Sequence, residues 1–197
     1  MSLCNRHSSS RRNALAGFTI IEMLVVMALI GVIMAIGLPR IDPNKYKADA
    51  AAVTLRSLLM QAQRDAIVRQ HDLIVSIDTA KRRLILGYDK NDDGTIQMTE
   101  RVRLQALPEG DSYATPPAYL SEPGMQEYGG FRGNAIKTIS GYPSVVFRRD
   151  GSVSSALEIY TKTPRGKAAD FRVVTVVQAT GRTAFQRYIG GNWTAVQ

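Results

Sequence analysis

One acidic side chain, Glu22, lies within an otherwise apolar run from Phe18 to Leu38. A carboxylate in hydrocarbon costs about 3 kcal/mol, and acidic residues kept at such positions are functional by default. A cation at the same depth offsets this cost, and the α-amine of a neighbouring molecule that begins at Phe18 would supply one. The alternative is that Glu22 reaches the headgroup layer and has no special role.

The segment Gly17-Phe18-Thr19-Ile20-Ile21-Glu22, after a basic leader and at the head of an apolar run, resembles the class III signal of type IV prepilins. In that family a prepilin peptidase cuts after the glycine and the new amino-terminal Phe is N-methylated. The glutamate at the fifth mature position then guides assembly. The resemblance implies cleavage between Gly17 and Phe18, N-methylation of Phe18 and an assembly role for Glu22. The alternative is a plain anchored periplasmic protein.

The leader, residues 1–17, ends in a basic stretch that predicts the topology of the chain. Arg11 and Arg12 stand just before the apolar run, and the leader has no acidic residue. A secretory signal would end in a small-residue cleavage site, whereas this apolar run is longer and lacks one. The positive-inside rule keeps the leader cytoplasmic and exports the bulk of the chain. We expect a single transmembrane helix over 18–38 in the inner membrane and a periplasmic C-terminal domain.

The hydrophobic pattern beyond Pro39 predicts one further helix and then strands. Residues 45–70 place alanines and leucines at helical spacing, which indicates an amphipathic helix that continues the membrane helix. After His71 the period changes to two, as in a β-domain over 71–197. The predicted strands are 73–77, 84–88, 102–107, 144–149, 156–161, 172–179 and 183–189. Residues 108–142, rich in proline and glycine, are predicted to form a long surface loop suited to mobility or partner contact.

A long helix, half in the membrane, packed on an antiparallel β-domain is an α+β fold and is also the layout of type IV pilins and pseudopilins. Residues 88–103 and 146–152 resemble the GspH/FimT family of minor subunits, with the Gly181-Arg182 hairpin behind them. The resemblance implies a structural subunit of a type IV pilus or a type II secretion pseudopilus. Its partners would be other pilins, the prepilin peptidase and N-methyltransferase, and the inner membrane. The membrane anchor occurs in both kinds of filament, so it does not indicate to which of the two this chain belongs.

The acidic segment 89–100 fits the twelve-position calcium-loop pattern. The positions that would bind calcium are Asp89, Asn91, Asp93 and Glu100, with Gly94 at the bend. Calcium takes six to eight oxygen ligands, which alternating Asp and Asn side chains can direct to one point. The flanks read as strands, which excludes an EF-hand, and Asp, Asn and Gly also form ordinary turns. A calcium site and a metal-free hairpin loop both stay open, and no other cofactor is expected.

The final third of the chain is basic. Residues 131–197 hold ten basic and three acidic side chains, although the whole chain has a net charge of only +8. Such a surface could attract DNA, anionic lipid or an acidic protein. The arginines considered for DNA phosphate are Arg148, Arg149, Arg182 and Arg187, joined by Arg172. In the FimT branch, which serves DNA uptake, a Gly-Arg-x-Arg element binds DNA, and this chain keeps only its first arginine, Arg182. The alternatives are a solvated basic face or a patch that matches an acidic neighbour in a filament.

The sequence offers no catalytic constellation, so we expect a protein that is not an enzyme. His7 and the only cysteine, Cys4, leave with the leader. His71 stands alone at the end of the predicted helix, and no nucleophile-elbow pattern accompanies it.

Overall fold

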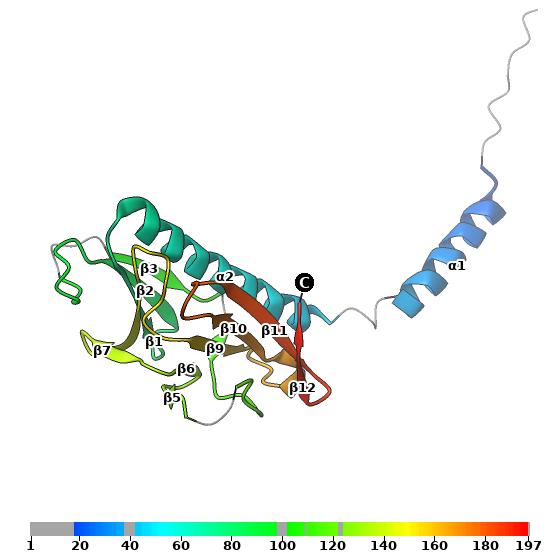
Figure 1. The fold of residues 1–197 in the computed structure, drawn as a ribbon. Coiled ribbons are helices and arrows are strands. Elements are labelled where there is room, and N and C mark those ends of the chain that lie inside the picture. Colours follow the sequence, from blue (N-terminus) through cyan, green and yellow to red (C-terminus); the bar gives the residue numbers. More distant parts are fainter. Residues whose placement is uncertain (1–17, 38–41, 98–101, 109, 122–123, 197) are drawn as a thin grey trace, which may run out of the picture. The chain divides into compact units, whose positions relative to one another are not determined.

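The computed structural model describes residues 18–37, 42–97, 102–108, 110–121 and 124–196. The chain divides into two units, Met1–Asp42 and Pro43–Gln197 (Figure 1). The predictions made for the leader, including Gly17, and for Glu100 lie outside the described residues.

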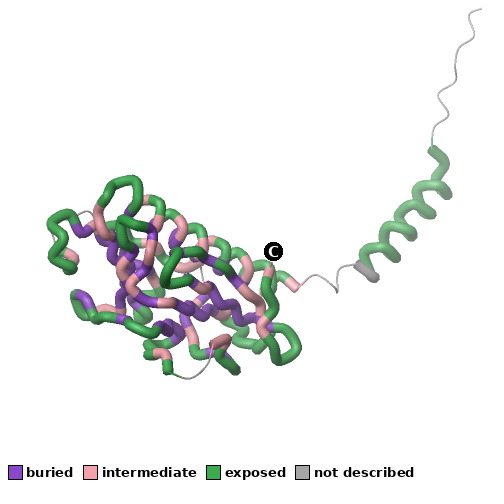
Figure 2. The backbone as a smooth tube through the Cα atoms, in the orientation of Figure 1, coloured by how far each residue is buried: buried purple, intermediate pink, exposed green. Residues whose placement is uncertain are grey.

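The first unit contains helix α1, Ile20–Gly37. Its start is set by Thr19, whose Oγ1 accepts a hydrogen bond of 3.3 Å from the backbone N of Glu22. A Thr followed three residues later by Glu is the sequence of a capping box, which satisfies otherwise free backbone N–H groups. Every side chain described on α1 is exposed (Figure 2). The sequence predicted a transmembrane helix over 18–38, but within the described residues no helix has the length and apolar character needed to cross a membrane.

The second unit begins with helix α2, Pro43–Arg69, close to the predicted 45–70. Proline suits the first turn of a helix because its missing N–H has no intrahelical partner there. The helix ends at Arg69, and Gln70, just after it, adopts a positive φ of 57°. Its buried side chains recur every three or four positions and form one face: Ala48, Ala51, Ala52, Leu55, Leu58, Leu59, Ala62 and Ala66. A helix with one buried face thus occupies residues 45–69 of the predicted 45–70, and its continuation from the membrane helix stays a prediction.

Two antiparallel sheets follow α2. The first has the order β3-β2-β1-β8-β7, and the second has the order β12-β11-β10-β9-β6-β5, with β4 paired to β9. The strands of the first sheet are β1 Leu73–Asp78, β2 Arg83–Tyr88, β3 Val102–Ala106, β7 Lys137–Ile139 and β8 Tyr142–Phe147. Those of the second are β4 Ser112–Tyr113, β5 Gln126–Glu127, β6 Phe131–Gly133, β9 Leu157–Lys162, β10 Arg172–Val176, β11 Thr183–Ile189 and β12 Asn192–Ala195. A short 3-10 helix, η2, covers Ala168–Asp170.

The core lies where α2 meets both sheets (Figure 2). In the second sheet, Val174 of β10 stands opposite Ile159 of β9 and Phe185 of β11, and all three join the core. The predicted α+β architecture, with a helix packed on antiparallel strands, is therefore confirmed. Each of the seven predicted strands has a counterpart, shifted at its ends by at most three residues.

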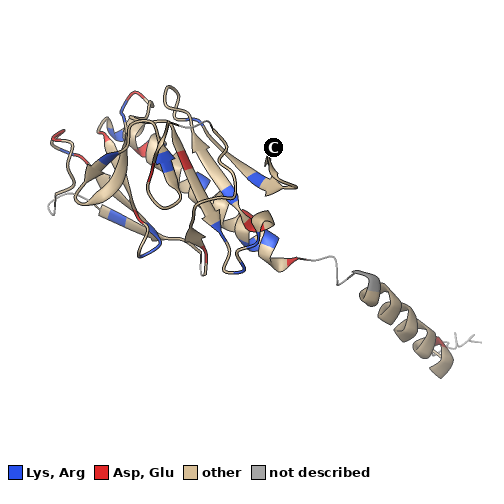
Figure 3. Cartoon of the chain, turned by 90° about the horizontal axis from the view of Figure 1, so that it is seen from below, with Lys and Arg blue, Asp and Glu red and all other residues tan. Residues whose placement is uncertain are grey.

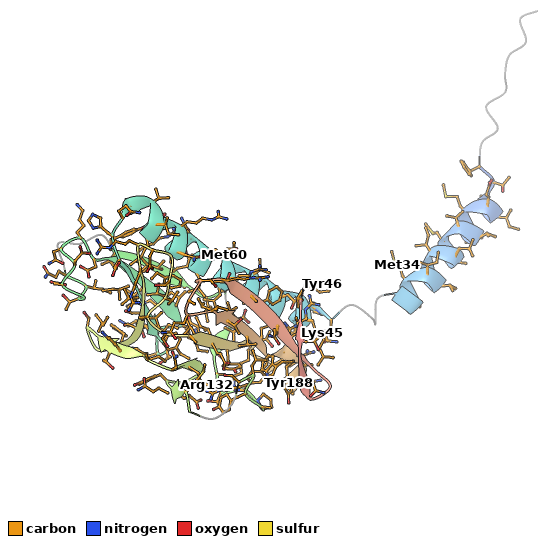
Figure 4. All side chains as sticks on the ribbon, viewed as in Figure 1. Met34, Lys45, Tyr46, Met60, Arg132 and Tyr188 are labelled. Atoms are coloured by element: carbon orange, nitrogen blue, oxygen red, sulfur yellow. The ribbon has the colours of Figure 1, made fainter. Side chains whose placement is uncertain are left out.

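The segment predicted as one long loop, 108–142, contains the short strands β4 to β7 instead. Each of these strands has only two or three residues, which is too few to show a period of two in the sequence. Part of the segment is also tied to the second sheet. The backbone N of Leu120 donates to Tyr160 Oη at 2.9 Å, and Tyr160 Oη donates to Glu158 Oε2 at 2.6 Å. The guanidinium of Arg132 lies 3.9 Å from the ring centre of Tyr119 (Figure 4, in which Arg132 is labelled).

Candidate functional site

Helix α1 presents an apolar surface on all sides and a single carboxylate. Phe18 is 74% exposed, and Ile20 and Ile33 are 83% and 69% exposed. Glu22 is the one acidic residue of the helix and lies in its first turn. A carboxylate is favoured there because the amino end of a helix carries partial positive charge. This capping position was not predicted from the sequence, although the Thr-x-x-Glu pattern is present in it.

The acidic loop folds onto its own backbone. Asp89 is buried, and its Oδ1 and Oδ2 accept hydrogen bonds from the backbone N of Asp93 (3.1 Å) and of Gly94 (2.8 Å). Asp93 Oδ1 accepts from both the backbone N and Oγ1 of Thr95, at 2.8 Å each, and its Oδ2 accepts from Asn91 Nδ2 at 2.9 Å. These bonds hold the pKa of Asp93 below its ordinary value, with the Thr95 hydroxyl the largest cause. The donors that bind the Asp89 and Asp93 carboxylates thus come from the loop itself.

A metal site in this loop stays a prediction. Among the described residues, no group of three or more His, Cys, Asp or Glu side chains could hold a metal ion. Glu100, which would close the predicted calcium site, lies outside those residues.

Arg149 links the acidic loop to the turn after β8. Its Nη2 lies 2.9 Å from Asp92 Oδ1, its Nε lies 3.5 Å from Asp72 Oδ1, and its backbone N donates to Asp72 Oδ1 at 3.1 Å. The hydrogen bond to Asp92 raises the pKa of Arg149 above its ordinary value. The two segments line a shared pocket of about 270 Å³: Asp72, Asp89, Asp92, Gly94, Lys137, Val146, Arg148, Arg149 and Ser154. Sequence reasoning treated the acidic and basic segments as separate sites.

Two of the other arginines connect α2 to the second sheet. Arg172 and Arg187 both bind Asp49 of α2, and this contact is called the Asp49 joint. Arg172 is 2% exposed, and its Nε donates to Asp49 Oδ1 at 2.6 Å. Arg187 binds the same carboxylate with two bonds, from Nε to Oδ1 (2.9 Å) and from Nη2 to Oδ2 (2.8 Å). Because Arg172 is buried, it is not part of the expected DNA-binding face, and the guanidinium of Arg187 is hydrogen-bonded to Asp49. No sequence pattern pointed to this pairing, because Asp49 lies 123 residues from Arg172.

Arg148 and Arg182 stand at two turns that are held together by Gln63 of α2. Gln63 Nε2 donates to the backbone O of Gly151 at 2.8 Å and to that of Thr180 at 2.7 Å. Both arginines are exposed, and the described residues provide no ion-pair partner for either. Elsewhere in residues 43–197 the basic side chains are spread over the helix and several strands (Figure 3). The structure therefore leaves two of the five arginines considered for DNA contact, Arg148 and Arg182, accessible and without an ion pair to a described acidic residue.

The Gln63 contact depends on glycine at position 181. Gly181 has a positive φ of 62°, and a Cβ there would lie 2.2 Å from Gln63 Nε2. Any other residue would therefore strain the turn and displace Gln63. The two turns that contain Asp150-Gly151 and Thr180-Gly181 thus meet at one side chain of the helix.

Two known structures are similar to this chain, both of the minor pseudopilin EpsH from the type II secretion system of Vibrio cholerae. One is 16% identical, covers 76% of this chain and 97% of that chain, and has a TM-score of 0.47. The other is 20% identical, covers 71% of this chain and 96% of that chain, and also has a TM-score of 0.47. A structural similarity at this level carries no argument about function.

Two further similarities come from the amino-acid sequence. The pilin-like protein PilA1 of Thermus thermophilus is 36% identical over 53 residues, which are 27% of this chain and 34% of that protein. The chain thus spans about a third of the length of the curated relative that it matches. Residues 12–38 match the family described as the prokaryotic N-terminal methylation motif. The predicted resemblance to type IV prepilins is confirmed by this match, and the chain carries a prepilin-type amino-terminal motif.

Proposed function

We propose that this chain is a minor pilin or pseudopilin, a structural subunit of a type IV pilus or of a type II secretion pseudopilus. A prepilin peptidase would cut between Gly17 and Phe18, and Phe18 would then be N-methylated. The match of residues 12–38 to the methylation motif supports the processing step. The observation that carries the assembly step is helix α1, whose apolar side chains are exposed on all sides.

Assembly would exchange one apolar environment for another. Before assembly, residues 18–38 would lie in the inner membrane, with Arg11 and Arg12 on the cytoplasmic side and residues 43–197 in the periplasm. In the filament, α1 would pack against the corresponding helices of other subunits. Glu22 would then pair with the α-amine of Phe18 of a neighbouring subunit, because an ion pair offsets the cost of a carboxylate in an apolar surround.

Two substitutions separate this role of Glu22 from its position in a capping box. Glu22→Gln removes the charge but keeps a side chain suited to the box, whereas Thr19→Ala removes the Oγ1 acceptor and keeps the charge. We expect Glu22→Gln to reduce incorporation into sheared or affinity-purified filaments at least tenfold, and Thr19→Ala to assemble normally. Normal assembly of Glu22→Gln, with loss of assembly in Thr19→Ala, would reduce Glu22 to a helix cap.

A second candidate function, DNA binding on the filament, rests on the two accessible arginines at the Gln63-linked turns. Arg148 and Arg182 are exposed and lie on turns held by the same side chain. Cations on adjacent turns can contact phosphates without reading sequence, and such binding weakens steeply with salt. Arg187 is the matched control, because it is an arginine of the same hairpin whose guanidinium is bound to Asp49.

Fluorescence anisotropy with duplex DNA of unrelated sequences tests this second function. We expect Arg182→Gln and Arg148→Gln each to lower the slope of log affinity against log salt by about one. Arg187→Gln should change this slope less. Absence of binding at tens of micromolar protein in low salt would remove the DNA role and leave the structural-subunit proposal intact.

A further inference from the structure

The carboxyl group of Asp111 is buried, and no described residue forms a hydrogen bond with it. The residue is 2% exposed, and neither Oδ1 nor Oδ2 has a hydrogen-bond partner. An ionised carboxylate without hydrogen bonds is among the most costly groups to bury, whereas the neutral acid costs much less. The protonation state of Asp111 therefore decides how well its segment fits the fold.

The backbone fixes Asp111 in this position. Gly110, just before it, has a positive φ of 89°, and the backbone N of Asp111 donates to the O of Pro108 at 3.1 Å. Just after it, Ser112 and Tyr113 form β4 and pair with Lys162 and Thr161 of β9. The turn on one side and the strand on the other leave the carboxyl pointing into the protein.

The surrounding charges do not neutralise Asp111 fully. Lys47 of α2 is the cation that acts on it, and Lys47 is itself exposed. Three other charged residues lie on described elements next to this segment. Arg165 pairs with Asp170 beyond Pro164, Lys162 stands opposite Ser112 in the β4 pairing, and Asp78 of β1 acts on Tyr113. Burial outweighs the attraction of Lys47 and raises the pKa of Asp111 to about 6.

We propose that Asp111 is a pH-sensitive latch that holds the segment Gly110–Tyr113 against β9 when protonated and releases it when ionised. The pairing to be broken is small, since β4 contributes only two residue pairs to β9. Local opening of β4 is therefore the least costly way to hydrate the carboxylate. Release would free the backbone of β9 at Thr161 and Lys162, which is an edge available for another strand.

The sign of the pH dependence follows from the direction of the shift. The folded-state pKa of Asp111 lies above its unfolded value, so its contribution to stability is complete below about pH 4. This contribution is lost as the pH rises to about 6 and beyond. Carboxyl groups with lowered pKa values, such as Asp78 and Asp170, act in the opposite direction and titrate at more acidic pH.

Thermal unfolding of the full-length protein in detergent, with Asp111→Asn beside the wild type, tests the latch. Asn has the same shape and no charge to lose. We expect the two proteins to melt within about 1 °C of each other at pH 3.5, which lies below both the unfolded-state and the folded-state pKa of Asp111, and the variant to melt about 4 °C or more above the wild type at pH 7.5. Asp150→Asn is the matched control, because Asp150 is exposed and the hydrogen bonds from Ser152 lower its pKa. This control should show no gain that grows with pH.

Amide hydrogen exchange locates the opening, after correction for the intrinsic pH dependence of exchange. The backbone N of Ala114, just after β4, donates to the O of Tyr160 at 3.2 Å. We expect its protection to fall at least tenfold between pH 5 and pH 7.5 in the wild type but not in Asp111→Asn. The amide of Tyr160, which donates to the O of Gly130 at 2.7 Å, should stay protected in both. A difference in melting temperature that does not change with pH, or equal protection of Ala114 at both pH values, would overturn the proposal.

Discussion

The two helices differ in how their apolar surface is covered. Helix α2 carries its apolar residues on one face, and that face is buried to between 0% and 9% exposure against the two sheets. Helix α1 is apolar around its circumference and buries none of the side chains described on it (Figures 2 and 4). A surface of that kind is stable only in lipid or against other apolar helices. Within residues 43–197, α2 therefore stabilises the fold, whereas contacts of α1 with other subunits belong to the proposed function.

The largest expected effect comes from the buried face of α2. Leu59 is 0% exposed and lies in the core, so Leu59→Ala should lower the free energy of unfolding by about 4 kcal/mol through lost burial and a residual cavity. Val25→Ala on α1, where the side chain is 53% exposed, should leave unfolding unchanged. Chemical denaturation followed by circular dichroism measures both.

The same two variants also test whether α1 contributes to filament assembly. In a filament-incorporation assay, Val25→Ala should reduce incorporation although its β-domain is as stable as the wild type. Equal losses of stability in the two variants would show that α1 takes part in the subunit core.

A smaller effect is expected at the polar joint between α2 and the second sheet. Asp49→Ala would leave Arg172, at 2% exposure, without its carboxylate partner. Removing one partner of a buried ion pair leaves an uncompensated charge, and partial exposure of Asp49 moderates the loss to about 2–3 kcal/mol. Asp49→Asn keeps an acceptor oxygen and should cost less. Urea unfolding compares the two, and equal stability of Asp49→Ala and the wild type would contradict the role of this joint.

The smallest effect is expected at the surface pair of Arg149. Both Arg149 and Asp92 are nearly half exposed, with side-chain exposures of 47% and 44%. Exposed ion pairs contribute between about 0 and 1 kcal/mol, so Arg149→Gln should hardly change the free energy of unfolding. It should increase hydrogen exchange in the acidic loop, since Arg149 links that loop to the turn after β8. If Arg149→Gln lowered the free energy of unfolding by more than about 2 kcal/mol, the pair of Arg149 and Asp92 would stabilise the fold as much as the Asp49 joint does.

Local pattern was enough to predict most of the fold. The spacing of Leu55, Leu59 and Ala62 predicted α2, and the alternation after His71 predicted the principal strands, because burial on one face imposes these periods. The strands β4 to β7 and β12 were missed, since two to four residues do not establish a period. The order of strands in the two sheets was not predicted, because it depends on pairings between residues far apart in the sequence.

The candidate sites likewise divide into those that the sequence predicted and those that depend on contacts between distant residues. Residues 17–22 were interpretable from sequence because the motif that they match is one continuous segment. The partners of the arginines were not, since each lies on a distant element: Asp49 on α2 for Arg172 and Arg187, and Asp92 in the acidic loop for Arg149. The unsatisfied carboxyl of Asp111 likewise produced no signal, because an Asp after Gly in a loop is an ordinary turn residue.

Mass spectrometry of the protein recovered from its native membranes tests the central claim, that α1 becomes an assembly surface after processing. We predict a mature chain that begins at Phe18, with the added mass of one methyl group on its α-amine and with Glu22 as its fifth residue. A chain that begins at Met1, or at a residue after Leu38, would contradict the account, because α1 would then either keep its leader or be absent from the mature protein.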